Sequence, residues 1–222
     1  LRGMLKFLTI LALGGGIMMT GCGQEAEAGN GSTFQEDVEF LQRHADVIIL
    51  KDSTGKARVA VVPAWQGRVM TSTNGGPQGS SFGWINYDLI SSGTILPHIN
   101  AFGGEDRYWM GPEGGQYSIF FKQGDPFDLD HWQTPACIDT DTWKALSASE
   151  RSVSFSEEVA LANYSGTALE MRIDRTVRLL ETREVADLLG TEVPQAVEIV
   201  GFESRNKLTN IGSEAWKKET GL

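Results

Sequence analysis

The chain has 222 residues, of which 41% are hydrophobic, 22% charged and 9% aromatic. These values are near the average for globular proteins and exclude a disordered, collagen-like or coiled-coil chain. Acidic residues outnumber basic ones by 29 to 19, which argues against nucleic-acid binding, since that needs a basic surface. The 26 glycines, together with the tryptophans and phenylalanines, favour an all-β protein with glycine-rich turns.

The N-terminal segment has the pattern of a secretory signal. Arg2 and Lys6 are followed by a short apolar run, which is too short for a transmembrane helix. The run ends in Met-Thr-Gly-Cys, which resembles a bacterial lipobox, where the signal is cut before a cysteine that is then lipidated. We therefore expect a lipoprotein signal peptide at 1–21, a lipidated Cys22 and a flexible tether at 22–32. The alternative is a plain secretory signal with an incidental cysteine.

This interpretation places the protein in the cell envelope, anchored to a membrane and facing the periplasm or the exterior. The second cysteine, Cys137, would then have no cysteine partner, so the folded domain would contain no disulfide. We interpret Cys137 as a small buried residue, and a reactive thiol is the alternative.

One helix is expected at the start of the mature chain. Thr33 and Glu36 fit a capping box, in which each residue satisfies a backbone N–H of the first helical turn. Phe34, Val38 and Leu41 have helical spacing and would share one apolar face. The helix should end near residue 45.

The remaining segments are expected to be mainly strands. Strict alternation of apolar and polar residues at 168–181 predicts a half-buried antiparallel strand. Turn residues at 52–55 lie between two β-rich runs and predict a hairpin. The other expected elements are strands at 47–50, 57–62, 67–72, 116–122, 153–157, 159–164, 197–202 and 203–210, a loop at 74–83 and one or two helical turns at 182–189. Residues 33–222 are thus predicted to form an antiparallel β-sandwich domain with a short N-terminal helix, either complete or truncated at its C-terminus.

Unusual side-chain chemistry is concentrated between residues 63 and 135. Three glycine-rich stretches, 63–76, 98–115 and 124–135, combine tryptophan with charged residues and histidine. An aromatic face stacks on the C–H side of a sugar ring, while carboxylates and arginine bind hydroxyls. The composition therefore indicates a carbohydrate site. The alternative is that the tryptophans close the ends of the sandwich.

We expect these three stretches to converge on one shallow polar cleft. The candidate catalytic residues are His131, Glu113 and Asp106. The candidate ligand-binding residues are Arg68, His98, Glu105, Arg107, Trp109 and Trp132. In the simpler alternative, Arg107 and its neighbouring carboxylates only hold the loops together.

Asp125, Asp128 and Asp130 precede His131, but their spacing does not match an EF-hand loop, and we assign no metal and no cofactor.

Three segments of the chain carry a resemblance to a known fold. PAWQGRVMTSTNGG, residues 63–76, looks like the opening of the galactose-mutarotase-like (aldose 1-epimerase-like) β-supersandwich proteins. GGEDRYWMGPEGG, residues 103–115, resembles a stretch of uncharacterised bacterial proteins with that fold, and 60–140 as a whole looks like a family of uncharacterised lipoproteins. ESRNKLTNIGSEAW, residues 203–216, resembles a later strand of these folds. The resemblance implies a supersandwich, of which this chain could be only the N-terminal part.

Aldose epimerases place a histidine acid and a glutamate base on opposite sides of the anomeric centre. The segment that carries their histidine has only a loose counterpart here, HINAF, which contains His98. Two classes of function remain open. One is a lipoprotein that binds or processes carbohydrate, as an epimerase-like or glycoside-acting enzyme if it is catalytic. The other is a non-catalytic structural or interaction lipoprotein. The expected partners are a carbohydrate and a membrane, and no nucleic acid.

Overall fold

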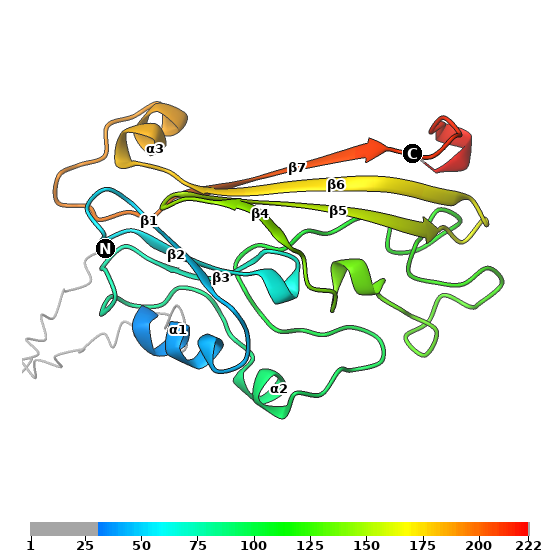
Figure 1. Cartoon of the computed structure of the whole chain (residues 1–222), viewed down its shortest axis with the longest axis horizontal. Coiled ribbons are helices and arrows are strands. Elements are labelled where there is room, and N and C mark those ends of the chain that lie inside the picture. The colour runs from blue at the N-terminus through cyan, green and yellow to red at the C-terminus, as the bar shows by residue number, and fades with distance from the viewer. Residues whose placement is uncertain (1–30, 222) are drawn as a thin grey trace, which may run out of the picture.

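Two antiparallel sheets face each other in the computed structural model, which describes residues 31–221 (Figure 1). The three-stranded sheet has the order β1 (Ile48–Lys51), β2 (Arg58–Val62) and β3 (Arg68–Thr73). The four-stranded sheet has the order β4 (Ala145–Ala148), β5 (Ser152–Ala162), β6 (Ala168–Leu179) and β7 (Phe202–Asn210). The predicted all-β sandwich with antiparallel strands is therefore confirmed.

Strand β6 explains why the sheets pack together. Its residues alternate between buried positions and half-exposed ones, because successive side chains of a strand point to opposite faces. The buried apolar residues of β6 are Leu169, Met171, Ile173, Val177 and Leu179. They share one hydrophobic core with Leu50, Val59, Val61 and Val69 of the three-stranded sheet. The alternation in the sequence thus identified the inner and outer faces of this sheet.

The three-stranded sheet also packs against helix α1 (Phe34–Gln42). The expected capping box is present, since the Thr33 side chain accepts a hydrogen bond from the backbone N–H of Glu36. Phe34 and Val38 of the helix pack against Ala60 of β2, which confirms the predicted short N-terminal helix and its apolar face. No helix among residues 31–221 is long and apolar enough to cross a bilayer.

Two further helices lie at the surface. Helix α2 (Tyr87–Ser92) begins at Asn86, whose side chain accepts from the backbone of Leu89, and it ends at Gly93 in the left-handed region. Helix α3 (Thr182–Leu189) follows β6 at the expected place and none of its residues is buried. Helix α2 was not predicted, although its asparagine cap and its glycine stop are both recognisable helix signals.

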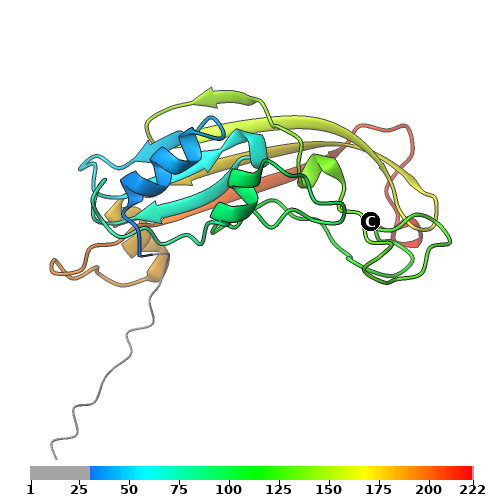
Figure 2. The ribbon, with the colours of Figure 1, turned by 90° about the horizontal axis from the view of Figure 1, so that it is seen from below.

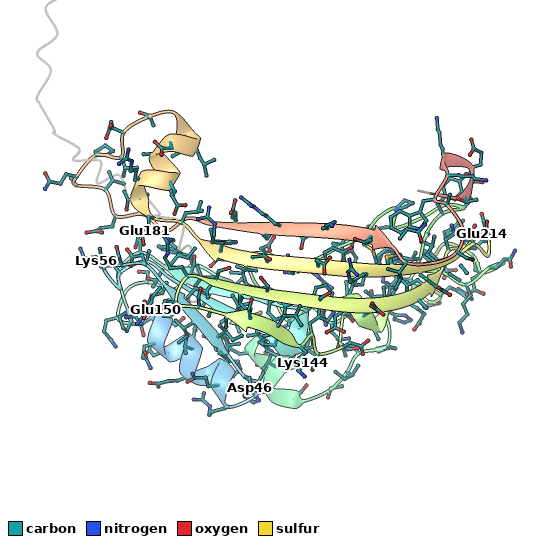
Figure 3. All side chains as sticks on the ribbon, turned by 45° about the horizontal axis from the view of Figure 1, so that its top comes forward. Asp46, Lys56, Lys144, Glu150, Glu181 and Glu214 are labelled. Carbon is teal, nitrogen blue, oxygen red and sulfur yellow. The ribbon has the colours of Figure 1, made fainter. Side chains whose placement is uncertain are left out.

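Ion pairs gather at the end of the molecule where α3 lies. Lys51 of β1 pairs with Glu150 at 3.1 Å and so joins the two sheets, while Arg151 and Glu181 pair at 3.1 Å next to the ends of β5 and β6. Figure 3 shows Lys56, Glu150 and Glu181 gathered at this end. These side chains are largely or partly exposed, so each pair contributes at most about 1 kcal/mol to stability.

Irregular backbone covers the other end of the long sheet. Residues 93–144 run beneath the far halves of β5 and β6 and contain only one short 3-10 helix, Ala136–Ile138 (Figures 1 and 2). Tyr108, Phe120 and Trp143 from this stretch are buried in the same core as Met171. The segment with the unusual side-chain chemistry therefore packs on the sheet directly.

Four predicted strands differ from the structure. Residues 116–122 form no strand, because Phe120 and Phe121 reach the core from irregular backbone. The two short strands expected at 153–157 and 159–164 are one strand, β5, since its pairing with β6 is uninterrupted. Residues 197–201 are not a strand either, and β7 begins only at Phe202. The short strand β4, with the sequence ALSA, was not predicted.

The predicted signal peptide at 1–21 and Cys22 lie outside the described residues, as does most of the predicted tether.

Candidate functional site

Aromatic rings from separate loop segments stack at the loop-covered end of the long sheet. Phe120 is fully buried, and its ring centroid lies 5.1 Å from that of Trp109 and 4.6 Å from that of Trp132. Phe121 meets Trp132 edge to face at 5.6 Å. We call these four residues the aromatic cluster. Ring pairs at such separations contribute about 0.5–1.5 kcal/mol beyond the burial of their area.

Three further predicted residues are attached to the aromatic cluster. The guanidinium of Arg107 lies over the ring of Trp109, 4.3 Å from its centroid. Glu113 accepts a hydrogen bond of 2.9 Å from the indole nitrogen of Trp109. His98 Nδ1 lies 2.7 Å from the backbone carbonyl oxygen of Trp132. Because a carbonyl can only accept, Nδ1 donates this hydrogen bond.

A pocket of about 310 Å³ opens beside the aromatic cluster. We call it the loop pocket. Its apolar part comes from Ile119, Phe120 and Phe121, and its polar part from Lys122, Gln123 and Gln133. One wall comes from Ala162 at the end of β5 and from Asn163 and Gly166 in the turn between β5 and β6. This volume lies at the lower end of the range for small-molecule sites.

Hydrogen bonds hold the wall of the loop pocket in place. Asn163 is buried, and its side-chain oxygen accepts from the backbone of Thr167 while its amide nitrogen donates to the backbone of Thr220. Ser165 donates from its hydroxyl to the backbone oxygen of Gln116 at 2.7 Å. The turn and the neighbouring loop are thus fixed to each other, so the pocket is formed before any ligand binds.

Asp106, a candidate catalytic residue, occupies a structural position. Its carboxylate pairs with Arg175, which is fully buried between the two sheets. Arg175 also donates to the backbone oxygen of Gly67 at 3.2 Å and to the side-chain oxygen of Asn206 at 2.9 Å. Ser204 donates to the second carboxylate oxygen of Asp106 at 3.3 Å. Both oxygens of Asp106 are therefore engaged within the sandwich.

Glu105 and Arg68 lie beside strand β3. Glu105 accepts a hydrogen bond of 2.9 Å from the hydroxyl of Ser72, and partial burial raises the pKa of its carboxyl. Arg68 is almost completely buried and donates to the backbone oxygen of Gly103 at 3.0 Å. The structure thus brings together Arg107, Trp109, Glu113, Trp132 and His98 but places Asp106 and Glu105 with other partners.

His131 directly precedes Trp132 of the aromatic cluster in the sequence. Its side chain forms an exposed pair with Asp128. Its Nδ1 is 2.5 Å from a carboxylate oxygen of Asp128. The three candidate catalytic residues, Asp106, Glu113 and His131, therefore have three different partners, and no hydrogen bond or ion pair within residues 31–221 joins any two of them. Their convergence on one cleft stays a prediction. Among residues 31–221, no group of three His, Cys, Asp or Glu side chains could hold a metal ion.

We expect His131 to titrate above the usual histidine value, because its hydrogen bond to Asp128 raises the pKa of the imidazole. With the folded pKa above the unfolded one, the stabilisation from this pair is fully present below the unfolded pKa. It is lost as the pH rises through the folded pKa. NMR titration of the His131 ring should show a lower pKa in Asp128→Asn than in the wild type.

The matched control for this titration is Asp130→Asn. Asp130 raises the pKa of His131 only through its charge, so its loss should move the titration less than the loss of Asp128. Equal shifts in both variants would contradict the assigned pair.

Cys137 is free and half-buried. Burial raises the pKa of its thiol to about 11, so little of it is thiolate at neutral pH. This favours its interpretation as an inert residue.

Sequence reasoning missed the polar residues of the loop pocket. Gln123 and Gln133 carry no local signal of function, since isolated glutamines are common on surfaces. Phe120 and Phe121 were recognised as apolar but assigned to a strand. Asn163 could have been found from the turn that it begins, because asparagine often hydrogen-bonds to the backbone of a following residue in turns.

The fold and the loop pocket define an all-β sandwich whose irregular loops build a small preformed pocket. Residues 32–222 match the model of a family of unknown function, DUF6786, and the chain belongs to this family. No curated protein and no solved structure matches the chain.

Proposed function

We propose that this protein is a lipid-anchored lipoprotein of the cell envelope that binds carbohydrate in the loop pocket. The observation that carries this proposal is the combination of an apolar lining, made by Ile119 and the buried Phe120 and Phe121, with the side-chain amides of Gln123 and Gln133 around one small space. The half-exposed apolar side chain of Ile119 suits the C–H face of a sugar ring. The amides both donate and accept hydrogen bonds, as sugar hydroxyls do.

The same arrangement favours binding over hydrolysis. A glycosidase needs two carboxyl groups on either side of the scissile bond, about 5–5.5 Å or 6.5–9.5 Å apart. Here Asp106 is paired with Arg175 within the sandwich, and Glu113 accepts a hydrogen bond from Trp109. Neither carboxylate lines the loop pocket. Sugar binding therefore needs no movement of these two carboxylates, whereas hydrolysis in the loop pocket would need both of them to move into it.

Sugar binding is tested on a glycan array and then by calorimetry with the sugar that the array selects. The full chain is used in an ethylene-oxide detergent, which has no sugar headgroup. Gln123→Ala and Gln133→Ala each remove a hydrogen-bonding side chain, so each should weaken binding by about 3–10-fold. Gln78→Ala is the matched control, because Gln78 is exposed in a different loop. Failure of the array to select any glycan, or equal loss in all three variants, would contradict the proposal.

The lipid anchor is tested separately by cell fractionation. Cys22→Ser should move the protein to the soluble fraction, because the serine hydroxyl cannot form the thioether. One acyl chain binds a membrane only marginally, so we expect the wild-type cysteine to be acylated more than once. Cys137→Ser is the control, and it should remain with the membrane. A Cys22→Ser protein that stays membrane-bound would show that the lipobox interpretation is wrong.

A further inference from the structure

Two arginines that interact electrostatically, the buried Arg68 and the partly exposed Arg107, have unpaired N–H groups. Arg68 is 1% exposed and donates from Nη1 to Gly103, while its Nε and Nη2 have no hydrogen-bond partner in the described part of the chain. Arg107 donates from Nη2 to the backbone oxygen of Ile138 at 2.5 Å, and its buried Nε is likewise without a partner there. We call Arg68 and Arg107 the arginine pair.

One carboxylate, that of Asp139, attracts both guanidinium groups, although it forms an ion pair only with Arg107. Asp139 is 3% exposed and lies 3.5 Å from Arg107, which is long for a charge-assisted hydrogen bond. Its oxygens also accept from the backbone nitrogen of Asn100 at 3.0 Å and from the Asn100 side chain at 2.8 Å. Two further carboxylates lie in this region: Asp106 is paired with Arg175, and Glu105 accepts a hydrogen bond from Ser72 and forms no ion pair with Arg68 or Arg107. The arginine pair therefore carries one more positive charge than its ion pairs balance.

Aromatic rings do not remove this imbalance. The guanidinium carbon of Arg68 lies 5.6 Å from the ring centroid of Phe102, and that of Arg107 lies 4.3 Å from the centroid of Trp109. A ring face attracts a cation, but it leaves the N–H groups in the guanidinium plane without acceptors. Burial, together with repulsion from Arg107, lowers the pKa of Arg68 to about 9. Buried unpaired charge of this kind is rare unless a further group supplies the missing acceptor.

We propose that the arginine pair binds the carboxylate group of a small ligand. A carboxylate offers two coplanar oxygens, which match the parallel N–H groups of a guanidinium, and its single charge balances the excess. The side chain of Arg107 is 23% exposed and connects the site to solvent. The carboxylate can belong to a free organic acid or to an acidic sugar such as a uronate. The proposal does not depend on carbohydrate binding, because a sugar-free carboxylate tests it.

The first experiment follows thermal unfolding of the full chain in an ethylene-oxide detergent by circular dichroism. Sodium acetate, sodium glucuronate or glucose is added while sodium chloride is adjusted to keep the ionic strength constant. Acetate should raise the Tm saturably, by roughly 5–10 °C at about 100 times its Kd. A larger effect of glucuronate at equal concentration would identify an acidic sugar as the source, and equal effects would identify a free acid. A Tm that is the same in acetate and in chloride would overturn the proposal.

The second experiment repeats the titration with variants. Arg68→Met should lose the acetate-dependent rise. In chloride alone it should be at least as stable as the wild type, because it removes an unbalanced buried charge. Arg205→Met is the matched control, since it removes the same charge from a side chain that is 75% exposed, and it should keep the rise. Persistence of the rise in Arg68→Met would overturn the proposal. If this variant does not fold, Arg107→Gln takes its place with the same expected loss.

The two proposals can fail independently. Gln133→Ala should keep the acetate response, since Gln133 belongs to the loop pocket. Loss of sugar binding with an intact acetate response would remove the carbohydrate proposal and leave the carboxylate site standing. The reverse result would remove only the carboxylate site.

Discussion

Replacing Asp106 with alanine should lower the free energy of unfolding by about 3–5 kcal/mol. Arg175 is fully buried between the two sheets, and Asp106 is its charged partner. Without that carboxylate the guanidinium would keep only the neutral acceptors of Gly67 and Asn206. Urea unfolding monitored by circular dichroism measures the change.

Two other variants show whether the unpaired charge causes this loss. Arg175→Met removes the buried charge itself, so it should cost less than Asp106→Ala. Glu203→Ala breaks ion pairs with Arg178 and Arg205 on the exposed side of the same sheet, and it should cost about 1 kcal/mol or less. If Asp106→Ala cost no more than Glu203→Ala, the pair with Arg175 would have no special role in stability.

Replacing Phe120 with alanine should lower the free energy of unfolding by about 3–5 kcal/mol as well. Phe120 is fully buried and packs against both Trp109 and Trp132, so its loss leaves a cavity at the centre of the aromatic cluster. Tryptophan fluorescence of the folded protein should change at the same time, because two indole rings lose their neighbour. Urea unfolding and emission spectra provide the two measurements.

The control for this substitution is Phe127→Ala. Phe127 contacts Phe121 and Tyr164 but is 51% exposed, so its removal leaves no closed cavity. Its cost should be about 1 kcal/mol. A similar cost for both substitutions would mean that the aromatic cluster relaxes to fill the space left by Phe120.

Local sequence signals predicted the elements whose structure depends on near neighbours. The capping box at Thr33 needs only Glu36, and the β1–β2 hairpin needs only the turn at 52–55. The alternation of β6 repeats every two residues, and it predicted both the strand and its buried face. The same alternation places Arg175 among the buried residues, so a charged residue at an inward position was a visible signal of the buried ion pair.

The loop pocket could not be predicted in the same way. The composition of residues 98–135 indicated a functional region, and five of the nine candidate residues are indeed connected through the aromatic cluster. The pocket, however, also needs the turn at 162–166, which is brought there by the pairing of β5 with β6. Contacts between segments so far apart depend on the whole fold. The partner of Asp106, in a strand 69 residues away, escaped prediction for the same reason.

The long axis of the sandwich determines what an anchored molecule would present to its surroundings. The described chain begins at the end that carries α3, whereas the turn between β5 and β6, which walls the loop pocket, lies at the opposite end (Figures 1 and 2). Eight residues lie between Cys22 and Gly31, and the nine steps from one to the other span at most about 30 Å in a fully extended chain. An acylated Cys22 would hold the α3 end near the lipid headgroups. The end that carries the loop pocket would then lie away from the membrane, where it could meet soluble or wall-bound molecules instead of lipids.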